Sequence, residues 1–452
     1  MQSIQKNSEH IVEITGYLHN GQGVAKINSF AIFIDGAIIG ERIKILIIKV
    51  SKNYAVGKIL EVIEKSDYRV EPVCQYYSRC GGCSLTHMSY VEQLNFKKIV
   101  VEDAIRKIGK IDATVSDVKG NDEYRYRNKT ILPVERSEKV AIGFFAKRSH
   151  SVISINDCLI QSENMNKVMN VFAKFLQDND ISIYDEEKKK GLVRNLMVRE
   201  GLNTGEIMVV PVVNGEELPK KDLLINNLIE NVQGIKSICL NVNRSQGNVV
   251  LGRENITIYG EGHITEELLG IKYRISPNSF FQVNTNQAGV LYSEVLDKCG
   301  DMKDKTVYDI YCGTGSISLL LAKKAKKVYG IEANEKAIDD ANINAENNSI
   351  DNVEFIAGKA EDVFPELYEE KKYADIVVVD PPRSGCAVKV LDTIISMQPK
   401  KIVYVSCNPA TLARDLNYLK EAGYGVDSIK PVDMFRETFH VETVVMLTQK
   451  LR

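Results

Sequence analysis

The sequence predicts a multidomain protein with an N-terminal OB-like β-barrel, a mixed α+β central domain and a C-terminal α/β domain built on a doubly wound, mainly parallel sheet. Three observations lead to this prediction. Short β-branched runs fill residues 9–64, three cysteines cluster within residues 67–90, and strands alternate with helices from about residue 270. A chain of 452 residues is long enough for roughly two to four domains.

The barrel is assigned to residues 1–66. Its five predicted strands are IVEITGYLH, VAKI, FAIFI, RIKILIIKV and AVGKILEVI, with turn-forming segments between them. Five short strands in so few residues are typical of a small OB-like barrel, which is a common platform for nucleic acid. From the pattern alone, a small β-barrel used for protein contact is an equal alternative.

The central domain is assigned to residues 67–265. Apolar residues spaced three and four apart predict a helix over about 89–109, which can pack on the C-terminal domain, and a second helix near 162–178. The segment YRYRNK at 124–129 interleaves aromatic and basic side chains, a pattern that suits base stacking and phosphate contact. A solvated strand face is the alternative for this segment.

The C-terminal domain is assigned to residues 266–452. TVYDIYCGTGSISLLLAKKA is predicted to form a strand, a glycine turn and a helix. A further helix is predicted at NEKAIDDANINAENN, and further strands at KVYGIEAN, VEFIAG, DIVVVDPP, KIVYVSCNP and ETVVMLTQ. In such sheets, ligands bind beyond the carboxyl ends of the strands, so we expect the site at that edge.

Three motifs at this edge predict a nucleoside-containing cofactor. Glycines at 313 and 315 allow close backbone approach, and Glu332 at the end of the next strand can accept hydrogen bonds from ribose hydroxyls. Asp380 ends a neighbouring strand. The third glycine of a dinucleotide fingerprint is missing, so the pattern favours S-adenosylmethionine over a dinucleotide.

Cys407 and Glu442 are the candidate reactive groups. Cys407 follows an apolar strand and precedes a helix that Asn408 caps, where the helix dipole is expected to favour the thiolate. Glu442 interrupts an apolar strand, and burial there would raise its pKa toward the value a general base needs. The alternatives are a buried structural cysteine and a carboxylate that faces solvent.

The chain has nine cysteines and a net charge of −2. An odd number of cysteines favours metal binding or catalysis over a disulfide framework. Cys74, Cys80, Cys83 and the distant Cys158 offer four thiolates, which suit zinc or an iron–sulfur cluster, and the spacing alone does not separate the two. No transmembrane run and no signal peptide are recognised, so a cytoplasmic location with no membrane partner is expected.

Together these motifs resemble the RNA uracil-5-methyltransferases. The resemblance is carried by SCNP at 406–409, HVET at 440–443, DIYCGTGSIS at 309–318, DPPRSG at 380–385 and FFQVN at 280–284, and the N-terminal barrel is similar to a TRAM domain. It implies a Rossmann-like methyltransferase domain with Cys407 as nucleophile and Glu442 as base. The residues implied to contact S-adenosylmethionine are Gln282, Tyr311, Glu332 and Asp380, and those implied to hold a [4Fe–4S] cluster are Cys74, Cys80, Cys83 and Cys158.

The resemblance also implies an RNA partner. Members with a barrel and a cluster mostly act on large-subunit ribosomal RNA, so 23S rRNA is favoured and tRNA is the alternative. No obligate protein partner is evident. Two rivals of other classes are an amino-methyltransferase, because DPP loops also occur where an exocyclic nitrogen is methylated, and a non-catalytic RNA-binding protein.

Overall fold

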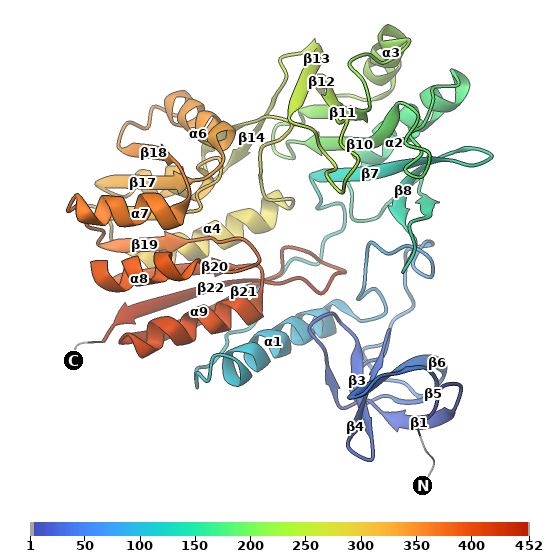
Figure 1. Ribbon diagram of the computed structural model, residues 1–452, viewed down its shortest axis with the longest axis horizontal. Coiled ribbons are helices and arrows are strands. Elements are labelled where there is room, and N and C mark those ends of the chain that lie inside the picture. Colours follow the sequence, from blue (N-terminus) through green and yellow to red (C-terminus); the bar gives the residue numbers. More distant parts are fainter. Residues whose placement is uncertain (1–3, 451–452) are drawn as a thin grey trace.

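The computed structural model describes residues 4–450, and within them three large sheets follow one another along the chain, with a two-stranded hairpin between the second and the third (Figure 1). The first is a six-stranded, all-β sheet in the order β1-β5-β6-β4-β3-β2. Every other residue of β5 faces inward, so Ile43, Ile45 and Ile47 are fully buried. The strands are β1 (Glu9–Glu13), β2 (Gly16–Tyr17), β3 (Gly23–Ile27), β4 (Phe30–Ile34), β5 (Arg42–Val50) and β6 (Tyr54–Glu64).

The first predicted strand of the barrel is divided in two. The Ile14 N–H donates to the Glu41 carbonyl, whereas the Thr15 N–H donates to the Val24 carbonyl. The chain therefore leaves one neighbouring strand and joins another at this point, which a hydrophobic pattern does not reveal.

The central region forms a seven-stranded sheet in the order β13-β12-β11-β10-β7-β8-β9. Its strands are β7 (Lys129–Arg136), β8 (Val140–Phe145), β9 (Val152–Ser154), β10 (Val193–Glu200), β11 (Ile207–Val213), β12 (Ile235–Val242) and β13 (Glu254–Gly260). Helices α2 (Glu163–Asp178) and α3 (Lys221–Asn231) share a hydrophobic core with this sheet. The Ser162 hydroxyl caps α2 by accepting from the Met165 N–H at 3.1 Å, which explains why the helix begins there.

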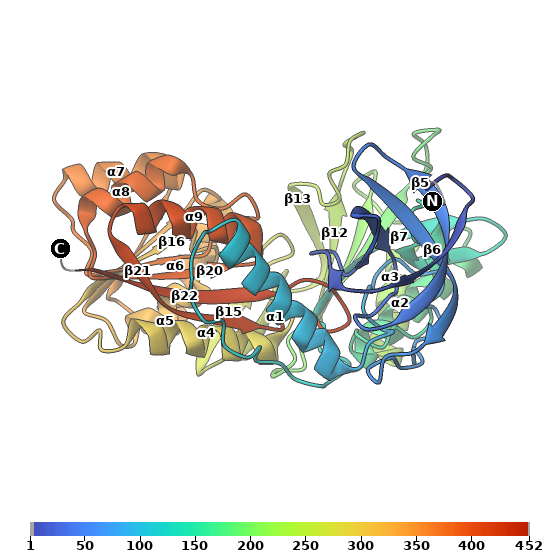
Figure 2. The ribbon, with the colours of Figure 1, turned by 90° about the horizontal axis from the view of Figure 1, so that it is seen from below.

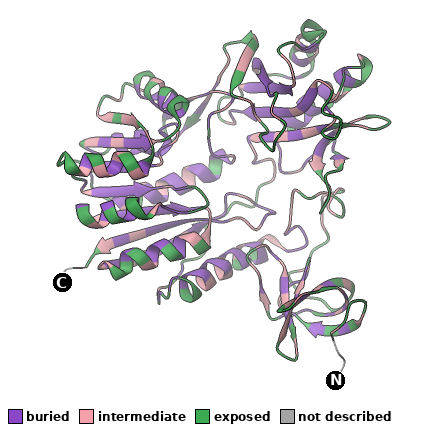
Figure 3. Cartoon of the chain, viewed as in Figure 1, coloured by how far each residue is buried: buried purple, intermediate pink, exposed green. Residues whose placement is uncertain are grey.

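The third sheet has the predicted α/β character. Its order is β18-β17-β16-β19-β20-β22-β21. The first five strands are parallel to one another, and β22 runs antiparallel to both of its neighbours, β20 and β21. The strands are β16 (Thr306–Ile310), β17 (Lys327–Glu332), β18 (Val353–Ala357), β19 (Ile376–Val379), β20 (Lys401–Ser406), β21 (Tyr424–Val432) and β22 (Glu442–Gln449). Figure 3 shows that the strands of this sheet are mostly buried, whereas the helices beside them carry many exposed residues.

Helices cover both faces of this sheet. One face packs against α4 (Thr285–Cys299), α5 (Ser316–Ala322), α6 (Glu335–Asn347) and the hairpin of β14 (Ile264–Leu268) and β15 (Ile271–Ile275). The other packs against α7 (Ala360–Glu369), α8 (Val388–Met397), α9 (Pro409–Glu421) and α1 (Tyr90–Lys107). No helix within residues 4–450 combines the length and apolar character needed to span a bilayer.

Helix α1 joins the barrel to the catalytic domain (Figure 2). Phe96 meets the barrel residue Tyr17 edge-on at a ring distance of 5.3 Å, and the Tyr17 hydroxyl donates to Glu92 at 2.5 Å. Val101 and Ile105 are buried in the core that α1 shares with the catalytic sheet. The helix therefore fixes the barrel beside the edge of that sheet.

A buried ion pair anchors α1 to the loop before β22. Lys97 pairs with Asp433, and both side chains are fully buried. Replacing Lys97 by alanine is expected to lower the free energy of unfolding by about 3–5 kcal/mol, because Asp433 would stay buried without its partner. Denaturant unfolding of the full chain would measure this loss. Lys98→Ala is the matched control because Asp117, the partner of Lys98, is exposed, and an equal loss in both variants would contradict the argument.

Candidate active site

The carboxyl ends of β16, β17, β19 and β20 surround a cavity of about 740 Å³ together with the start of β22. This volume lies within the roughly 300–1,000 Å³ that small-molecule sites occupy. Six of the predicted site residues line the cavity, although they come from six separate segments of the chain: Gln282, Tyr311, Glu332, Asp380, Cys407 and Glu442.

The turn after β16 approaches the cavity with its backbone. Gly315 has a φ of +78°, and a Cβ at this position would lie 2.7 Å from the Phe355 ring, so only glycine fits. Tyr311 has a φ of 70°, which is rare for a bulky residue and common at functional sites. The Glu332 carboxylate accepts from the Gly313 N–H at 3.2 Å and from the Asn334 N–H at 2.8 Å. Glu332 therefore fixes the turn and still faces the cavity.

Cys407 and Glu442 are brought together by strand register. In the antiparallel pair of β20 and β22, Ser406 is opposite Thr443. The next position along this register places Cys407 opposite Glu442, and residues opposite each other in such a pair lie about 4.5–5.5 Å apart between Cα atoms. Asn408 caps α9 by accepting from the Ala410 N–H at 3.0 Å, so Cys407 does precede a helix as the sequence predicted.

The electrostatic surroundings of the two groups differ from the expectation in one respect. Burial raises the pKa of Glu442 to about 8, and the nearby charge of Asp380 adds to the rise. Burial also raises the pKa of the Cys407 thiol to about 11, with further contributions from Glu442 and Asp380, while Arg383 lowers it. The expectation that the helix start favours the thiolate is not met, because desolvation and two neighbouring carboxylates act against it.

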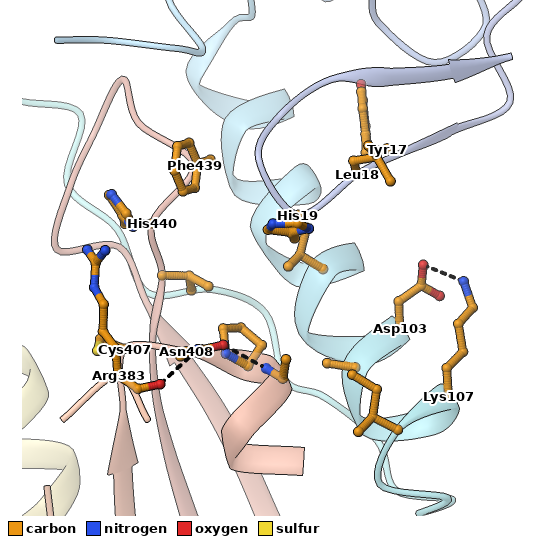
Figure 4. Close-up of a pocket in the computed structure, with 16 residues that line it drawn as sticks. Tyr17, Leu18, His19, Asp103, Lys107, Arg383, Cys407, Asn408, Phe439 and His440 are labelled. Atoms are coloured by element: carbon orange, nitrogen blue, oxygen red, sulfur yellow. Dashed lines mark hydrogen bonds and ion pairs between the residues drawn. The ribbon is translucent and has the colours of Figure 1, made fainter. Parts of the chain in front are cut away.

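A second cavity of about 580 Å³ adjoins the first (Figure 4). Its walls come from the barrel turn at Leu18 and His19, from α1, and from the loop before β22. Three residues line both cavities: Arg383, Cys407 and His440. The thiol therefore lies where a cofactor-sized cavity meets a cleft that opens between the barrel and the catalytic domain.

Several residues of the site were not predicted. Asp309 is fully buried at the cavity, and burial raises its pKa to about 7. Arg127, Arg383 and His440 also line the cavity, and each lies in a motif that the sequence analysis quoted. The motifs could therefore have suggested these three residues. The order of residues along the chain did not show that their side chains face the same cavity.

The four predicted cluster cysteines also share one cavity. Cys74, Cys80, Cys83 and Cys158 line an apolar space of about 30 Å³. Burial raises the pKa of Cys158 to about 11, and the nearby Cys80 and Cys74 add to that rise. Burial raises the pKa of Cys83 still further, with added contributions from Cys158 and Glu437. Within residues 4–450, no group of three or more histidine, cysteine or acidic side chains is arranged to hold a metal ion. Four thiols that face one space are the donor type that a zinc ion or an iron–sulfur cluster binds.

Comparison with known proteins identifies the family. The family model described as tRNA (Uracil-5-)-methyltransferase matches residues 89–450, and that of the TRAM domain matches residues 5–60. Relatives named "Uncharacterized RNA methyltransferase" occur in Clostridium tetani (49% identical, covering 98% of this chain and 97% of that protein) and Staphylococcus aureus (42% identical, covering all of both chains).

A solved structure is similar along nearly the whole chain. It is the Pyrococcus abyssi tRNA (uracil-54, C5)-methyltransferase in complex with S-adenosyl-L-homocysteine, with a TM-score of 0.78, 30% identity, and coverage of 97% of this chain and 99% of that one. S-adenosylmethionine is therefore the cofactor of this chain. The protein belongs to the tRNA (uracil-5-)-methyltransferase family and is an S-adenosylmethionine-dependent RNA uracil-5-methyltransferase with a TRAM domain.

Proposed function

We propose that this enzyme methylates C5 of a uridine in 23S rRNA, with Cys407 as the nucleophile and Glu442 as the base. One observation carries the assignment of roles. Cys407 lies at the junction of the two cavities, and the register places the buried Glu442 opposite it. A uracil that enters from the cleft would meet the thiol before it meets the larger cavity.

The chemistry of uracil requires these two groups. C5 is a poor nucleophile until a thiolate adds to C6, which gives C5 carbanion character. S-adenosylmethionine supplies an electrophilic methyl group on its sulfonium. Once C5 carries the methyl group, a base must remove the C5 proton so that the Cys407 sulfur can leave and the ring double bond can form again. A stacked uridine cannot offer C6 to a thiol, so the nucleotide must be flipped into the site.

We assign the cofactor contacts from the position of each side chain. Glu332 ends β17, where a carboxylate can accept from ribose hydroxyls. Gln282 is buried at the cavity, and its backbone carbonyl accepts from the Asn128 side chain at 2.9 Å, which holds the segment in place. Asp380 and Tyr311 complete the set, since both line the same cavity.

Two classes of RNA compete as the substrate. The barrel together with the four-cysteine cavity supports 23S rRNA, because the larger family members that combine these parts mostly act on it. The name of the Pyrococcus abyssi relative supports tRNA, and its similarity extends over 97% of this chain, which must include the barrel. The barrel alone therefore does not separate the two, and the four cysteines carry the preference.

Mapping of 5-methyluridine tests the substrate directly. In a strain that lacks this gene, we expect the modification to disappear from a 23S rRNA position while tRNA keeps its own. The purified enzyme should restore the missing methyl group on ribosomal RNA from that strain. Loss of 5-methyluridine from tRNA alone would establish the alternative.

We further propose that Cys74, Cys80, Cys83 and Cys158 hold a [4Fe–4S] cluster. Four thiolates can hold either a zinc ion or an iron–sulfur cluster, and the resemblance to the larger family members favours the cluster. The Gly82 N–H donates to the Cys80 sulfur at 3.4 Å, a contact of the kind that stabilises cluster ligands. The cavity is small, but three of the cysteines lie on a loop without helix or strand, which can adjust.

Purification without oxygen tests this site. We expect a brown protein with about four irons per chain, and Cys83→Ser should lose the iron. Cys239→Ser, which changes a buried cysteine in the central sheet, should keep it. A colourless protein that contains zinc would contradict the proposal.

A further inference from the structure

His440 occupies a position that the reaction described so far does not use. It lies two residues before Glu442 on the loop that leads into β22, and it lines both cavities together with Cys407. In Figure 4 it appears on the same side of the cleft as Arg383 and Cys407. A nucleobase that reaches Cys407 from the cleft therefore enters a space that this imidazole lines.

The ring is held by packing rather than by hydrogen bonds. Phe439 contacts it at a centroid distance of 4.2 Å, and Phe435 contacts it edge-on at 5.7 Å. No hydrogen bond of the ring nitrogens is formed within residues 4–450, and neither nitrogen is among the buried polar atoms that lack a partner. The ring is therefore oriented by its carbon surface, and its nitrogen edge is open toward the cavities.

The imidazole is neutral under ordinary conditions. Burial lowers its pKa to about 4, and the cationic side chains of Arg383, Lys97 and Arg127 add to that effect. A neutral imidazole has one N–H donor and one acceptor nitrogen. It can therefore offer a hydrogen bond to an oxygen without adding a full charge beside Cys407.

We propose that His440 is a further catalytic residue whose N–H donates a hydrogen bond to O4 of the target uracil. This inference rests on the proposed function of Cys407 and Glu442. Glu442 must reach C5, and O4 is attached to C4, the ring atom next to C5. A side chain two residues before Glu442, lining the same cavity wall, is placed to reach that oxygen.

The hydrogen bond would act where charge develops. The Cys407 thiol first loses its proton to solvent. When the resulting thiolate bonds to C6, the electron pair of the C5–C6 double bond moves to C5–C4, and the C4 carbonyl becomes an enolate with its negative charge on O4. When C5 takes the methyl group, the electron pair of the broken S–CH3 bond stays on the donor sulfur, which leaves as a neutral thioether, and the C4 carbonyl returns. Removal of the C5 proton by Glu442 produces the enolate again, and its collapse expels the sulfur. A donor at O4 therefore stabilises both the first and the last step.

Covalent trapping by RNA that contains 5-fluorouridine stops the reaction before its last step, because the C5 fluorine of the methylated adduct cannot be removed as a proton is. Its rate therefore reports the attack on C6 and the methyl transfer that follows. His440→Leu should trap about a hundredfold more slowly than the wild type, the size of effect seen when one oxyanion donor is removed. His440→Gln retains an N–H donor, and it should recover trapping to within about tenfold of the wild type. His263→Ala is the matched control, because the imidazole of His263 makes its polar contacts with Glu261, and this residue lines neither cavity. Its trapping rate should not change.

The outcomes separate this inference from the proposed function. RNA affinity and S-adenosylmethionine affinity should stay within about twofold in the His440 variants, because the hydrogen bond strengthens only as O4 gains charge. Trapping by His440→Leu at the wild-type rate, or a His440→Gln protein as slow as His440→Leu, would overturn the inference. If the wild-type protein forms no adduct, the roles of Cys407 and Glu442 fail first.

Discussion

Cys407→Ala is expected to abolish covalent trapping by 5-fluorouridine RNA and to reduce turnover by roughly 10⁴–10⁶-fold, the loss that follows removal of an enzyme nucleophile. Without the sulfur no bond forms at C6, and C5 never becomes nucleophilic. The thiol is half-buried at the junction of two cavities, so its loss should disturb little packing. Denaturing gel electrophoresis of labelled RNA would detect the adduct, and release of tritium from 5-³H-uridine would measure turnover.

A second cysteine provides the control for Cys407. Cys299 is fully buried at the end of α4, and its carbonyl accepts from Lys401 at the opposite end of β20. Cys299→Ala should trap RNA at the wild-type rate, even if its thermal stability falls. Normal trapping by Cys407→Ala would mean that another group attacks C6, and the mechanism proposed above would fail.

Glu442→Gln is expected to accumulate a methylated adduct that releases slowly. Glutamine has nearly the same shape, so attack and methyl transfer should continue, but it cannot accept the C5 proton. Loss of a general base lowers a rate by about 10²–10⁴-fold, and we expect the rate of adduct release to fall by this factor. Mass spectrometry of the protein–RNA adduct would show the added methyl group. Full turnover by this variant would remove Glu442 as the base.

The pH dependence of release gives an independent check on Glu442. Its pKa is raised to about 8, and a base must be ionised, so at pH 7 only about a tenth of the carboxyl groups are active. Release should therefore rise nearly tenfold per pH unit below 8 and level off above it. Because Cys407 also titrates, the adduct should be formed at one pH and its release followed after a jump to another.

The comparison variant for this measurement is Glu354→Gln. Glu354 lies on the edge strand β18 and pairs with Lys327 at 3.2 Å, away from both cavities. Its release profile should match that of the wild type, whereas the profile of Glu442→Gln should lose the rise below pH 8. A rise that persists in Glu442→Gln would assign the titration to another group.

The sequence alone was sufficient where the signal is local. Runs rich in β-branched residues predicted the barrel strands, and strands that alternate with helices predicted the α/β sheet. The cap at Asn408 predicted the helix after Cys407. The motifs were specific enough to indicate the family, which the matching family model and relatives confirm. That membership also favours carbon methylation over the amino-methyltransferase and non-catalytic alternatives.

Only the tertiary structure decided which groups meet and in what electrostatic setting. In the pairing of β20 with β22, Ser406 is opposite Thr443, so the adjacent residues Cys407 and Glu442 come together although they are 35 positions apart in the printed sequence. The pKa of the Cys407 thiol rises because burial and two carboxylates from other segments outweigh the helix start. The inward position of His440 depends on contacts with Phe435 and Phe439. Desolvation and through-space charge depend on distances between remote segments, and a linear pattern does not contain those distances.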